Sequence, residues 1–357
     1  MKPKLFIPGP THVDQEILDA MSQYPIGHRT PAYRELQAKV VSGIKEVLYT
    51  EQSVLVSTSS ATGLMEAGVR NLSKKKVANF VCGAFSQRQA DITKICGLDQ
   101  DIFYVEWGQA TTAEQVDSAL SQGNYDLVTV VFNETSTGVM NPLAEIGEVV
   151  KNYPDVLLMV DAVSGMAGAP IKVDEWGIDM ALASVQKAWG LPPGFAVTSL
   201  SDAALERSRS IPESQKGFYF DFVRMHKAGE KSQTTITPGI PHLYALSTQL
   251  DRIKQEGLEN RFARHTAMAN RVREWGAEKF GLFPQAGYES DTLTCFNNKL
   301  GIDLIALAGK MKERNYLISG GYGDLKGKTF RLAHMGNLQM DDINDVLNVL
   351  DEVLGEL

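Results

Sequence analysis

The chain has 357 residues, of which 43% are hydrophobic and 22% charged, values that are ordinary for a globular protein. Its formal net charge is −8, with 35 Lys and Arg against 43 Asp and Glu dispersed along the chain, so the charge favours neither a nucleic acid nor an anionic membrane as partner. Residues 1–13 hold too few apolar residues for a signal peptide and no window reaches 18 uninterrupted apolar residues, so we expect a cytoplasmic protein.

Seven short apolar segments occupy the first two hundred residues, and helix-length stretches separate most of them. Because these segments are apolar without alternation, they predict strands buried on both faces of a mostly parallel sheet. The predicted strands are 53–57, 77–81, 101–105, 127–132, 156–160, 179–184 and 195–199. The last two are too close for a helical crossover, so we expect a hairpin there and a mixed sheet.

After about residue 250 the pattern changes to a long amphipathic helix and a few separate elements. Gly257 interrupts the helix. The predicted elements are a helix at 243–280, a strand at 292–296, a helix at 303–315, a hairpin-like pair within 316–336 and a helix at 340–357. This order predicts a small α/β domain packed on the large one. We therefore divide the chain into an N-terminal arm at 1–15, a large domain at 16–250 and a small C-terminal domain at 251–357.

Polar side chains follow the predicted strands, where open α/β sheets bind their ligands. Asp161 directly follows 156–160, and Lys187 lies 26 residues further on, about one crossover and strand away. Alone, Asp161 is also typical of a turn cap and Lys187 of an ordinary strand-end lysine. Together they match the needs of pyridoxal phosphate, which takes an amine to form a Schiff base and a carboxylate to keep its pyridine nitrogen protonated.

A stretch of small and hydroxyl residues, Ser59 to Gly63, opens a predicted helix after the first strand. Free amides at such a helix start can hold a phosphate, although a plain N-cap has the same pattern. No Gly-Lys-[Ser/Thr] follows and no GxGxxG follows the first strand. These absences argue against an NTPase and exclude a Rossmann dehydrogenase.

Two further residues have both a structural and a functional interpretation. Phe85 is either a core or turn aromatic or a ring that stacks on a planar cofactor. Arg331 alternates with Phe330 and Leu332, so on a strand it faces the opposite side. It is either a surface residue or a fork for a substrate carboxylate.

Six motifs together resemble the class V aminotransferases of pyridoxal phosphate fold type I, in the alanine/serine–glyoxylate branch. They occur in consistent order between Pro8 and about Met335 and read PGPTHV, GHRTPAY, SSATGLMEA, NETSTGV, VDAVSG and SVQKAWGLPPG. The resemblance implies an α/β fold with a mostly parallel, mixed seven-stranded sheet flanked by helices, plus a smaller C-terminal α/β domain. It also implies pyridoxal 5′-phosphate as the cofactor.

The resemblance implies that Lys187 forms the Schiff base and moves the substrate's α-proton, while Asp161 pairs with the pyridine nitrogen. The other implied cofactor contacts are Phe85 and Val163 at the ring, Thr135 at the 3-hydroxyl, and Ser60, Ala61, Thr62 and Gln186 at the phosphate, with Thr237 reaching the phosphate from the other subunit. Relatives with a tyrosine three residues before this threonine use it there too, whereas this chain has Thr234.

The substrate contacts implied by the resemblance are Arg331 at the carboxylate, Gly9 in the N-terminal arm, and His28 and Arg29 from the partner. The protein is therefore expected to be a homodimer with shared active sites. The implied reaction is a ping-pong transfer of the amino group of alanine or serine to glyoxylate or pyruvate. No residue of the sequence separates alanine from serine as the donor.

Three alternatives remain open. A phosphoserine or aminoethylphosphonate transaminase needs extra cations, for which His28, Arg29 and Lys326 are the candidates. A cysteine desulfurase-like lyase needs an exposed, mobile cysteine, while Cys295 belongs to a predicted core strand and Cys82 follows a buried one. A non-catalytic binding protein of this fold is expected to lack Lys187 or Asp161. The three cysteines, Cys96 included, have no metal-ligand spacing, so we predict reduced thiols and no metal site.

Overall fold

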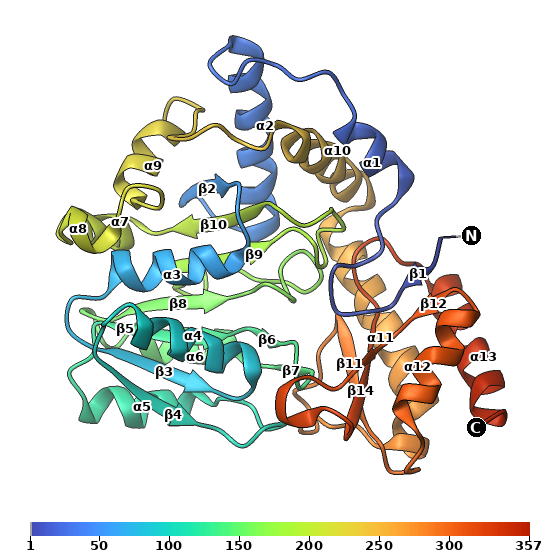
Figure 1. Ribbon diagram of the computed structural model, residues 1–357. Coiled ribbons are helices and arrows are strands. Elements are labelled where there is room, and N and C mark those ends of the chain that lie inside the picture. Colours follow the sequence, from blue (N-terminus) through green and yellow to red (C-terminus); the bar gives the residue numbers. More distant parts are fainter. Residues whose placement is uncertain (1) are drawn as a thin grey trace.

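The computed structural model describes residues 2–357, and a seven-stranded sheet forms the centre of its larger part (Figure 1). The strand order is β2-β10-β9-β8-β5-β3-β4. In chain order the strands are β2 (Ser53–Ser57), β3 (Val77–Val81), β4 (Gln100–Tyr104), β5 (Leu127–Val131), β8 (Leu157–Asp161), β9 (Met180–Ser184) and β10 (Ala196–Leu200). Only β10 runs antiparallel to its neighbours, which confirms the mixed sheet and the predicted pairing of the last two strands.

Every predicted strand of this sheet lies within one residue of its observed bounds. The prediction works because six of the seven strands are buried along most of their length, so that their apolar runs contrast sharply with the flanking turns. Asp161, expected just beyond its strand, is the last residue of β8.

Helices cover both faces of the sheet. Alternate residues of β2 show the division, because Val54 and Val56 belong to one apolar cluster and Leu55 to the other. The first face is covered by α2 (Pro31–Leu48), α5 (Ala113–Gln122), α6 (Leu143–Val150) and α10 (Ile240–Glu256). The second is covered by α3 (Ala61–Leu72), α4 (Ala84–Ile95), α7 (Asp202–Arg209), α8 (Glu213–Lys216) and α9 (Phe222–Gly229).

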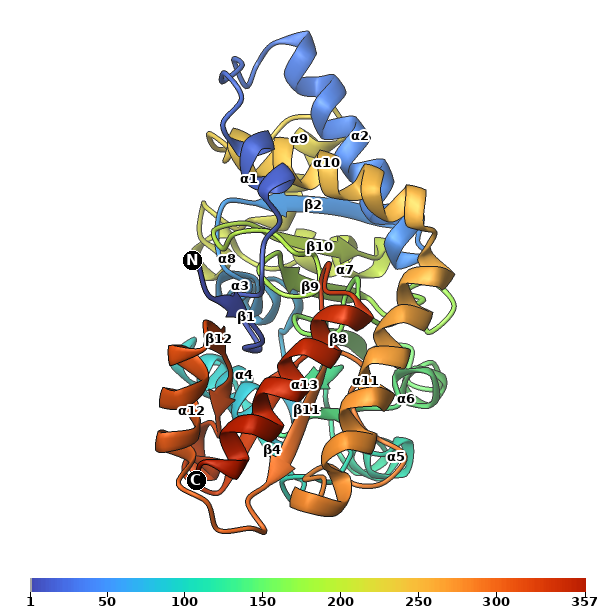
Figure 2. The same ribbon diagram turned by 90° about the vertical axis from the view of Figure 1, so that its right-hand side faces the viewer.

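A second structural unit, with its own apolar cluster, forms around a three-stranded sheet, β11-β14-β13. Its elements are α11 (Leu258–Phe280), β11 (Leu293–Asn297), α12 (Leu304–Glu313), β12 (Tyr316–Leu317), β13 (Ser319–Gly320), a 3-10 turn (Gly323–Leu325), β14 (Thr329–Ala333) and α13 (Met340–Gly355). α11 and α13 pack side by side (Figure 2). The elements match the predicted order, except that the long helix expected at 243–280 is two helices, α10 and α11. Gly257, with φ +82°, ends the first and begins the second.

The N-terminal segment links the two parts of the molecule. β1 (Lys4–Leu5) pairs with β12, Phe6 is fully buried in the core of the second unit, and α1 (Gln15–Met21) packs on α10 (Figures 1 and 2). A short hairpin, β6 (Asn133–Glu134) and β7 (Val139–Met140), follows β5. Among the residues described here, no helix is both long and apolar enough to cross a bilayer.

Candidate active site

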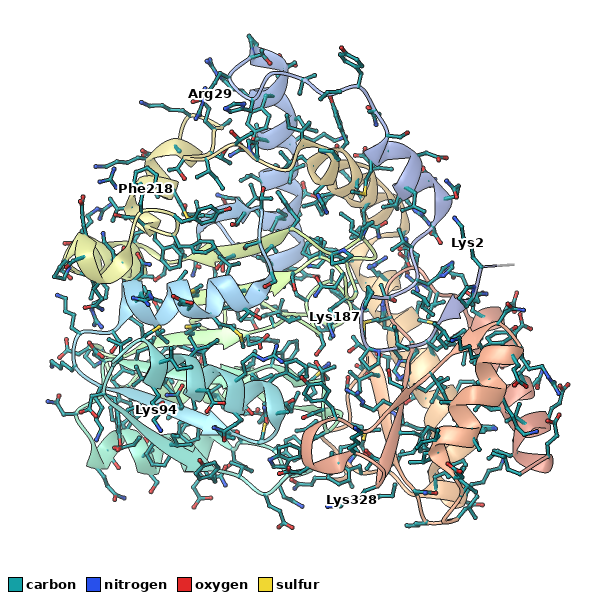
Figure 3. All side chains as sticks on the ribbon, viewed as in Figure 1. Lys2, Arg29, Lys94, Lys187, Phe218 and Lys328 are labelled. Carbon is teal, nitrogen blue, oxygen red and sulfur yellow. The ribbon has the colours of Figure 1, made fainter. Side chains whose placement is uncertain are left out.

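Lys187 lies in the loop after β9, where the large sheet meets the second unit (Figure 3). Its side chain is only 8% exposed, and its Nζ donates to the Pro8 carbonyl at 2.5 Å. The pKa of this amine is lowered to about 8, mainly by burial and secondly by the charge of Arg331. A Cβ at Gly9 would lie 2.7 to 2.8 Å from atoms of the Lys187 side chain, so only a glycine lets the N-terminal arm approach this closely.

Asp161 ends β8, the strand beside β9, and is 6% exposed. Its Oδ1 accepts a hydrogen bond from the Val163 amide at 2.9 Å, and its second oxygen accepts none from residues 2–357. Burial raises the pKa of this carboxyl to about 7, and the Glu134 charge adds to the effect. Asp161 therefore has an open acceptor that a buried cation would satisfy.

Glu134, a residue that we did not single out in the sequence, organises the neighbouring helix start. It is completely buried, and its carboxylate accepts hydrogen bonds from the amides of Phe85 and Ser86 at the start of α4. The Ser136 and Ser86 hydroxyls donate to it as well, at 2.6 and 3.0 Å. A carboxylate at a helix N-terminus is stabilised by the free amides there. Glu134 thereby fixes the position of Phe85.

Thr135 and Arg331 meet beside Lys187. The Arg331 Nη1 donates to the Thr135 carbonyl at 3.0 Å, and its Nε and Nη2 donate to the Gly320 carbonyl at 3.1 and 3.0 Å. Arg331 is 6% exposed, so its interpretation as a surface residue is wrong. These bonds use three of the five guanidinium N–H groups and leave two for a carboxylate. The Thr135 hydroxyl donates to Ser164 Oγ at 2.8 Å.

Phe85 stands within a small aromatic and cationic group. Its ring stacks on Tyr322 with a centroid separation of 5.3 Å, and Lys187 Nζ lies 5.9 Å from its centroid. The Arg88 guanidinium lies 4.8 Å from the same centroid and donates to the Tyr322 hydroxyl at 3.1 Å. Arg88 forms no ion pair of 4.0 Å or less with an acidic side chain of the described residues, although its charge acts on Asp161. Arg88 follows Phe85 by three residues in α4, and the sequence alone does not single it out.

The start of α3 offers backbone donors at the same edge of the sheet. Ser60 is its N-cap residue and makes no side-chain capping bond, so the amides of Ala61 and Thr62 have no partner within the helix. Gln186, half-buried, directly precedes Lys187. Val163 follows Asp161 by two residues and is half-buried as well. Free amides at a helix start are donors suited to an anion.

Three predicted residues lie elsewhere in the chain. Arg29 is far from Lys187 in Figure 3, and it donates to the Thr234 carbonyl at 2.9 Å. His28 is its half-buried neighbour. Thr237 is exposed, and Gly239, two residues on, donates to Thr58 Oγ1 at 2.7 Å. The Thr234 hydroxyl donates within its own loop to the Ile236 carbonyl.

The residues at the sheet edge fit pyridoxal phosphate. They comprise a buried amine with a lowered pKa, a buried carboxyl with one unused oxygen, and free helix-start amides for a phosphate. They do not form a metal site, because no three His, Cys, Asp or Glu side chains of residues 2–357 gather in one place.

Comparison with known proteins agrees with this chemistry. A family model described as aminotransferase class-V matches residues 4–275. An uncharacterized aminotransferase of Methanocaldococcus jannaschii is 38% identical over all of this chain and 94% of its own length. A protein of Synechococcus named as the small subunit of a soluble hydrogenase is 32% identical over 100% of this chain and 94% of its own. Further relatives at 31% identity are named serine– or aspartate–glyoxylate aminotransferases.

The crystal structure of an alanine–glyoxylate aminotransferase from Nostoc superposes with a TM-score of 0.93 at 29% identity, covering 99% of this chain and 96% of that one. The chain therefore belongs to the class-V aminotransferase family, a family of pyridoxal phosphate-dependent enzymes, and has their type I fold.

Proposed function

We propose that this aminotransferase moves the amino group of a small amino acid, alanine or serine, to a small 2-oxo acid, glyoxylate or pyruvate, in a ping-pong reaction. The observation that carries the proposal is the buried Lys187 amine, whose pKa of about 8 lies within reach of neutral pH, beside the open Asp161 carboxyl. The names of relatives at 31% identity support glyoxylate as the acceptor.

The cofactor, when bound, supplies an aldehyde for the amino group and a ring that withdraws electrons from the substrate's α-carbon. Lys187 would hold the cofactor at this aldehyde and, with its amine free, would move the substrate's α-proton. At pH 7 a pKa of about 8 leaves roughly one amine in ten unprotonated, enough for a general base. Asp161, whose second oxygen accepts no hydrogen bond from residues 2–357, would hold the ring nitrogen and keep it protonated.

The remaining residues bind and orient. The amides at the start of α3, with Ser60, Thr62 and Gln186, hold the phosphate, and Thr135 binds the 3-hydroxyl. Phe85 and Val163 would contact the ring. The two free N–H groups of Arg331 bind the substrate carboxylate, because carbonyls already fix the guanidinium in place. Gly9 keeps the N-terminal arm close to Lys187 and narrows the space for the substrate's side chain.

The test is the visible absorbance of the purified protein, scanned before and after separate additions of L-alanine, L-serine, L-aspartate and O-phosphoserine. We expect a yellow protein that L-alanine or L-serine bleaches and that glyoxylate restores, with Lys187→Ala as the uncoloured control. A wild-type protein that stays colourless with added pyridoxal phosphate would exclude the proposal.

The proposed enzyme is a homodimer in which His28, Arg29 and Thr237 serve the partner's site. Its support is that Arg29 lies far from Lys187 in one chain and is exposed. Subunits carrying Lys187→Ala, when mixed with subunits carrying Arg29→Ala, should form hybrids with one intact site and regain activity. If Arg29 acts within its own chain, the hybrids contain no intact site and the mixture stays inactive.

A second candidate function, amino transfer from a donor with an anionic side chain such as phosphoserine or aspartate, has one observation in its favour. Arg88 lies beside Phe85 with no acidic partner among the described residues, and it is a cation that the sequence alone did not indicate. Arg88→Met distinguishes the two candidates. For this second function, the variant loses kcat/KM for O-phosphoserine or L-aspartate about tenfold or more relative to L-alanine. If the enzyme uses small neutral donors, Arg88→Met leaves the ratio of kcat/KM for O-phosphoserine or L-aspartate to that for L-alanine unchanged.

A desulfurase has no such support. Cys82 and Cys295 are buried, and burial raises the pKa of each thiol to about 12, so neither supplies a thiolate near neutral pH. Burial also raises the pKa of Cys96, which follows the last turn of α4.

A further inference from the structure

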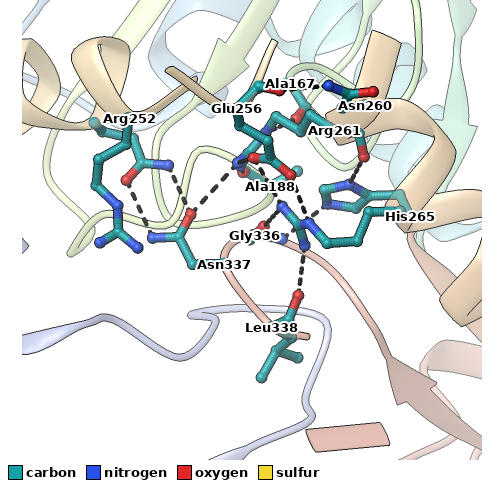
Figure 4. Close-up of polar contacts among 12 residues, drawn as sticks. Ala167, Ala188, Arg252, Glu256, Asn260, Arg261, His265, Gly336, Asn337 and Leu338 are labelled. Atoms are coloured by element: carbon teal, nitrogen blue, oxygen red, sulfur yellow. Dashed lines mark hydrogen bonds and ion pairs between the residues drawn. The ribbon is translucent and has the colours of Figure 1, made fainter. Parts of the chain in front are cut away.

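A fully buried arginine joins the loops that follow β8 and β9. Arg261, in the first turn of α11, is 1% exposed. Its Nη2 donates to the Ala188 carbonyl at 2.7 Å and its Nε to the Ala167 carbonyl at 2.8 Å (Figure 4). Ala188 directly follows Lys187, and Ala167 lies in the loop that begins after Asp161. One planar guanidinium thus fixes the spacing of the two loops next to the candidate chemistry.

Glu256, the last residue of α10, links Arg261 to a second arginine. Its Oε2 accepts from Arg261 Nη1 at 3.1 Å, and its Oε1 accepts from Arg264 Nε at 2.6 Å. The break at Gly257 brings this carboxylate next to the first turns of α11. Burial opposes its ionisation, but the bonds and charges of Arg264 and Arg261 together outweigh burial and lower the pKa of Glu256.

Arg264 reaches the other half of the site. Its Nη2 donates to the Gly336 carbonyl at 3.2 Å and its Nη1 to the Leu338 carbonyl at 2.5 Å. These carbonyls lie in the turn after β14, the strand that carries Arg331. The two arginines therefore share one carboxylate but hold different segments, Arg261 the Lys187 side and Arg264 the Arg331 side.

His265 locks the same turn. Its Nδ1 donates to the Arg261 carbonyl at 2.8 Å, and its Nε2 accepts from the Gly336 amide at 3.1 Å. This pair of bonds requires the neutral ring with the proton on Nδ1. Burial and the two arginines lower the pKa of His265 well below its ordinary value, so the ring stays neutral across the physiological range.

We propose that Arg261 is a positioning residue that acts on Lys187 through the Ala188 carbonyl, and that Arg264 positions Arg331 through the turn at Gly336. Stability alone does not require this arrangement, because a buried ion pair is often replaceable by apolar side chains without loss. The arrangement instead fixes the position of the Lys187 amine, which moves the substrate's proton, relative to the Arg331 guanidinium, which binds the substrate's carboxylate. The proposal rests on the proposed function only where its test measures kcat and KM.

The experiment compares Arg261→Lys with Arg264→Lys in the full-length, cofactor-loaded enzyme. Each variant keeps a cation beside Glu256 and loses the fork that reaches the carbonyls. Arg252→Lys is the control, because Arg252 pairs with Asp14 and Glu16 and donates to none of these carbonyls. We measure kcat and KM for the amino donor, the pH dependence of the visible absorbance, and the unfolding midpoint.

We expect Arg261→Lys to lower kcat about tenfold or more with KM changed less than about threefold, and to shift the pH midpoint of the absorbance. Arg264→Lys is expected to show the reverse, a KM raised about fivefold or more with kcat and the absorbance titration nearly unchanged. Arg252→Lys leaves all three readouts unchanged.

The proposal is overturned if both variants lose activity only in proportion to their folded fraction, or if their kcat and KM change in parallel. Should Arg261→Lys fail to fold, Arg261→Met removes the same donors at similar volume and must give the same absorbance shift. A wild-type protein that takes up the cofactor but transfers no amino group would contradict the proposed function, while the absorbance and unfolding comparisons would still test the role of Arg261.

Discussion

Lys187 and Arg261 are both buried cations, and their surroundings are opposite. Lys187 has one hydrogen bond, to a backbone carbonyl, and lies beside Asp161, whose second oxygen accepts none from the described residues. Arg261 donates to two carbonyls and to Glu256, which in turn accepts from Arg264. At the junction of α10 and α11, formed by Glu256, Arg261 and Arg264, each side chain thus uses most of its donors or acceptors. At the sheet edge, Lys187 and Asp161 keep donors and acceptors unused. A buried polar group with unused donors or acceptors costs stability, so its presence indicates a functional site.

Asp161→Asn tests the sheet-edge side of this comparison and should have the largest effect. We expect activity to fall about a hundredfold or more, because an amide cannot keep a ring nitrogen protonated. Without cofactor the same change should stabilise the protein. The folded-state pKa of about 7 exceeds the ordinary 3.8, so wild-type stability is lost as the pH rises between these values, by roughly 4 kcal/mol at most.

Urea unfolding of the cofactor-free protein at pH 4 and pH 8 measures this effect. The wild-type protein and the Asp161→Asn variant should have similar stability near pH 4, and the variant should be the more stable of the two at pH 8. Equal or lower stability of the variant at pH 8 would contradict the assignment of Asp161 as a buried carboxyl without a hydrogen-bonded cation.

Glu256→Gln tests the junction and should have the opposite sign. Removing the shared carboxylate charge leaves Arg261 buried without its ion-pair partner, which we expect to cost about 2 to 3 kcal/mol near neutral pH. The pKa of Glu256 is lowered in the folded state, so its contribution is present above the ordinary carboxyl pKa and is lost as the pH falls through the folded value. Unfolding curves between pH 3 and pH 8 should therefore converge at the acidic end.

Glu134→Gln should give the smallest of the three effects. It sharpens the comparison of the sheet edge with the junction, because Glu134 belongs to the candidate site and yet all its acceptors have donors. A Gln side chain has one acceptor oxygen in place of two, so the amides at the start of α4 lose part of their partners. We expect a loss of about 1 to 2 kcal/mol and weaker cofactor binding through a displaced Phe85. Calorimetry of the unfolding transition and a cofactor titration measure the two parts, with Ser136→Ala as the milder control.

The elements of the fold were accessible to sequence reasoning where their signals are local. Each strand of the large sheet is a short apolar run with sharp ends, and burial along most of these strands makes such runs nearly continuous. Gly257 also signalled an interruption, but whether the chain bends slightly or breaks into two helices depends on its φ of +82° and on what packs around it.

Lys187 and Asp161 were visible in the sequence because Asp161 ends a strand and Lys187 closely follows one, and strand ends have a fixed place at the sheet edge. Glu134, Arg88 and Arg261 were not, since their importance depends on partners 48 to 234 residues away in the sequence. The sequence alone does not distinguish a buried carboxylate from an exposed one. Only the tertiary structure decides which charged groups are desolvated, and desolvation is what separates a saturated junction from a reactive site.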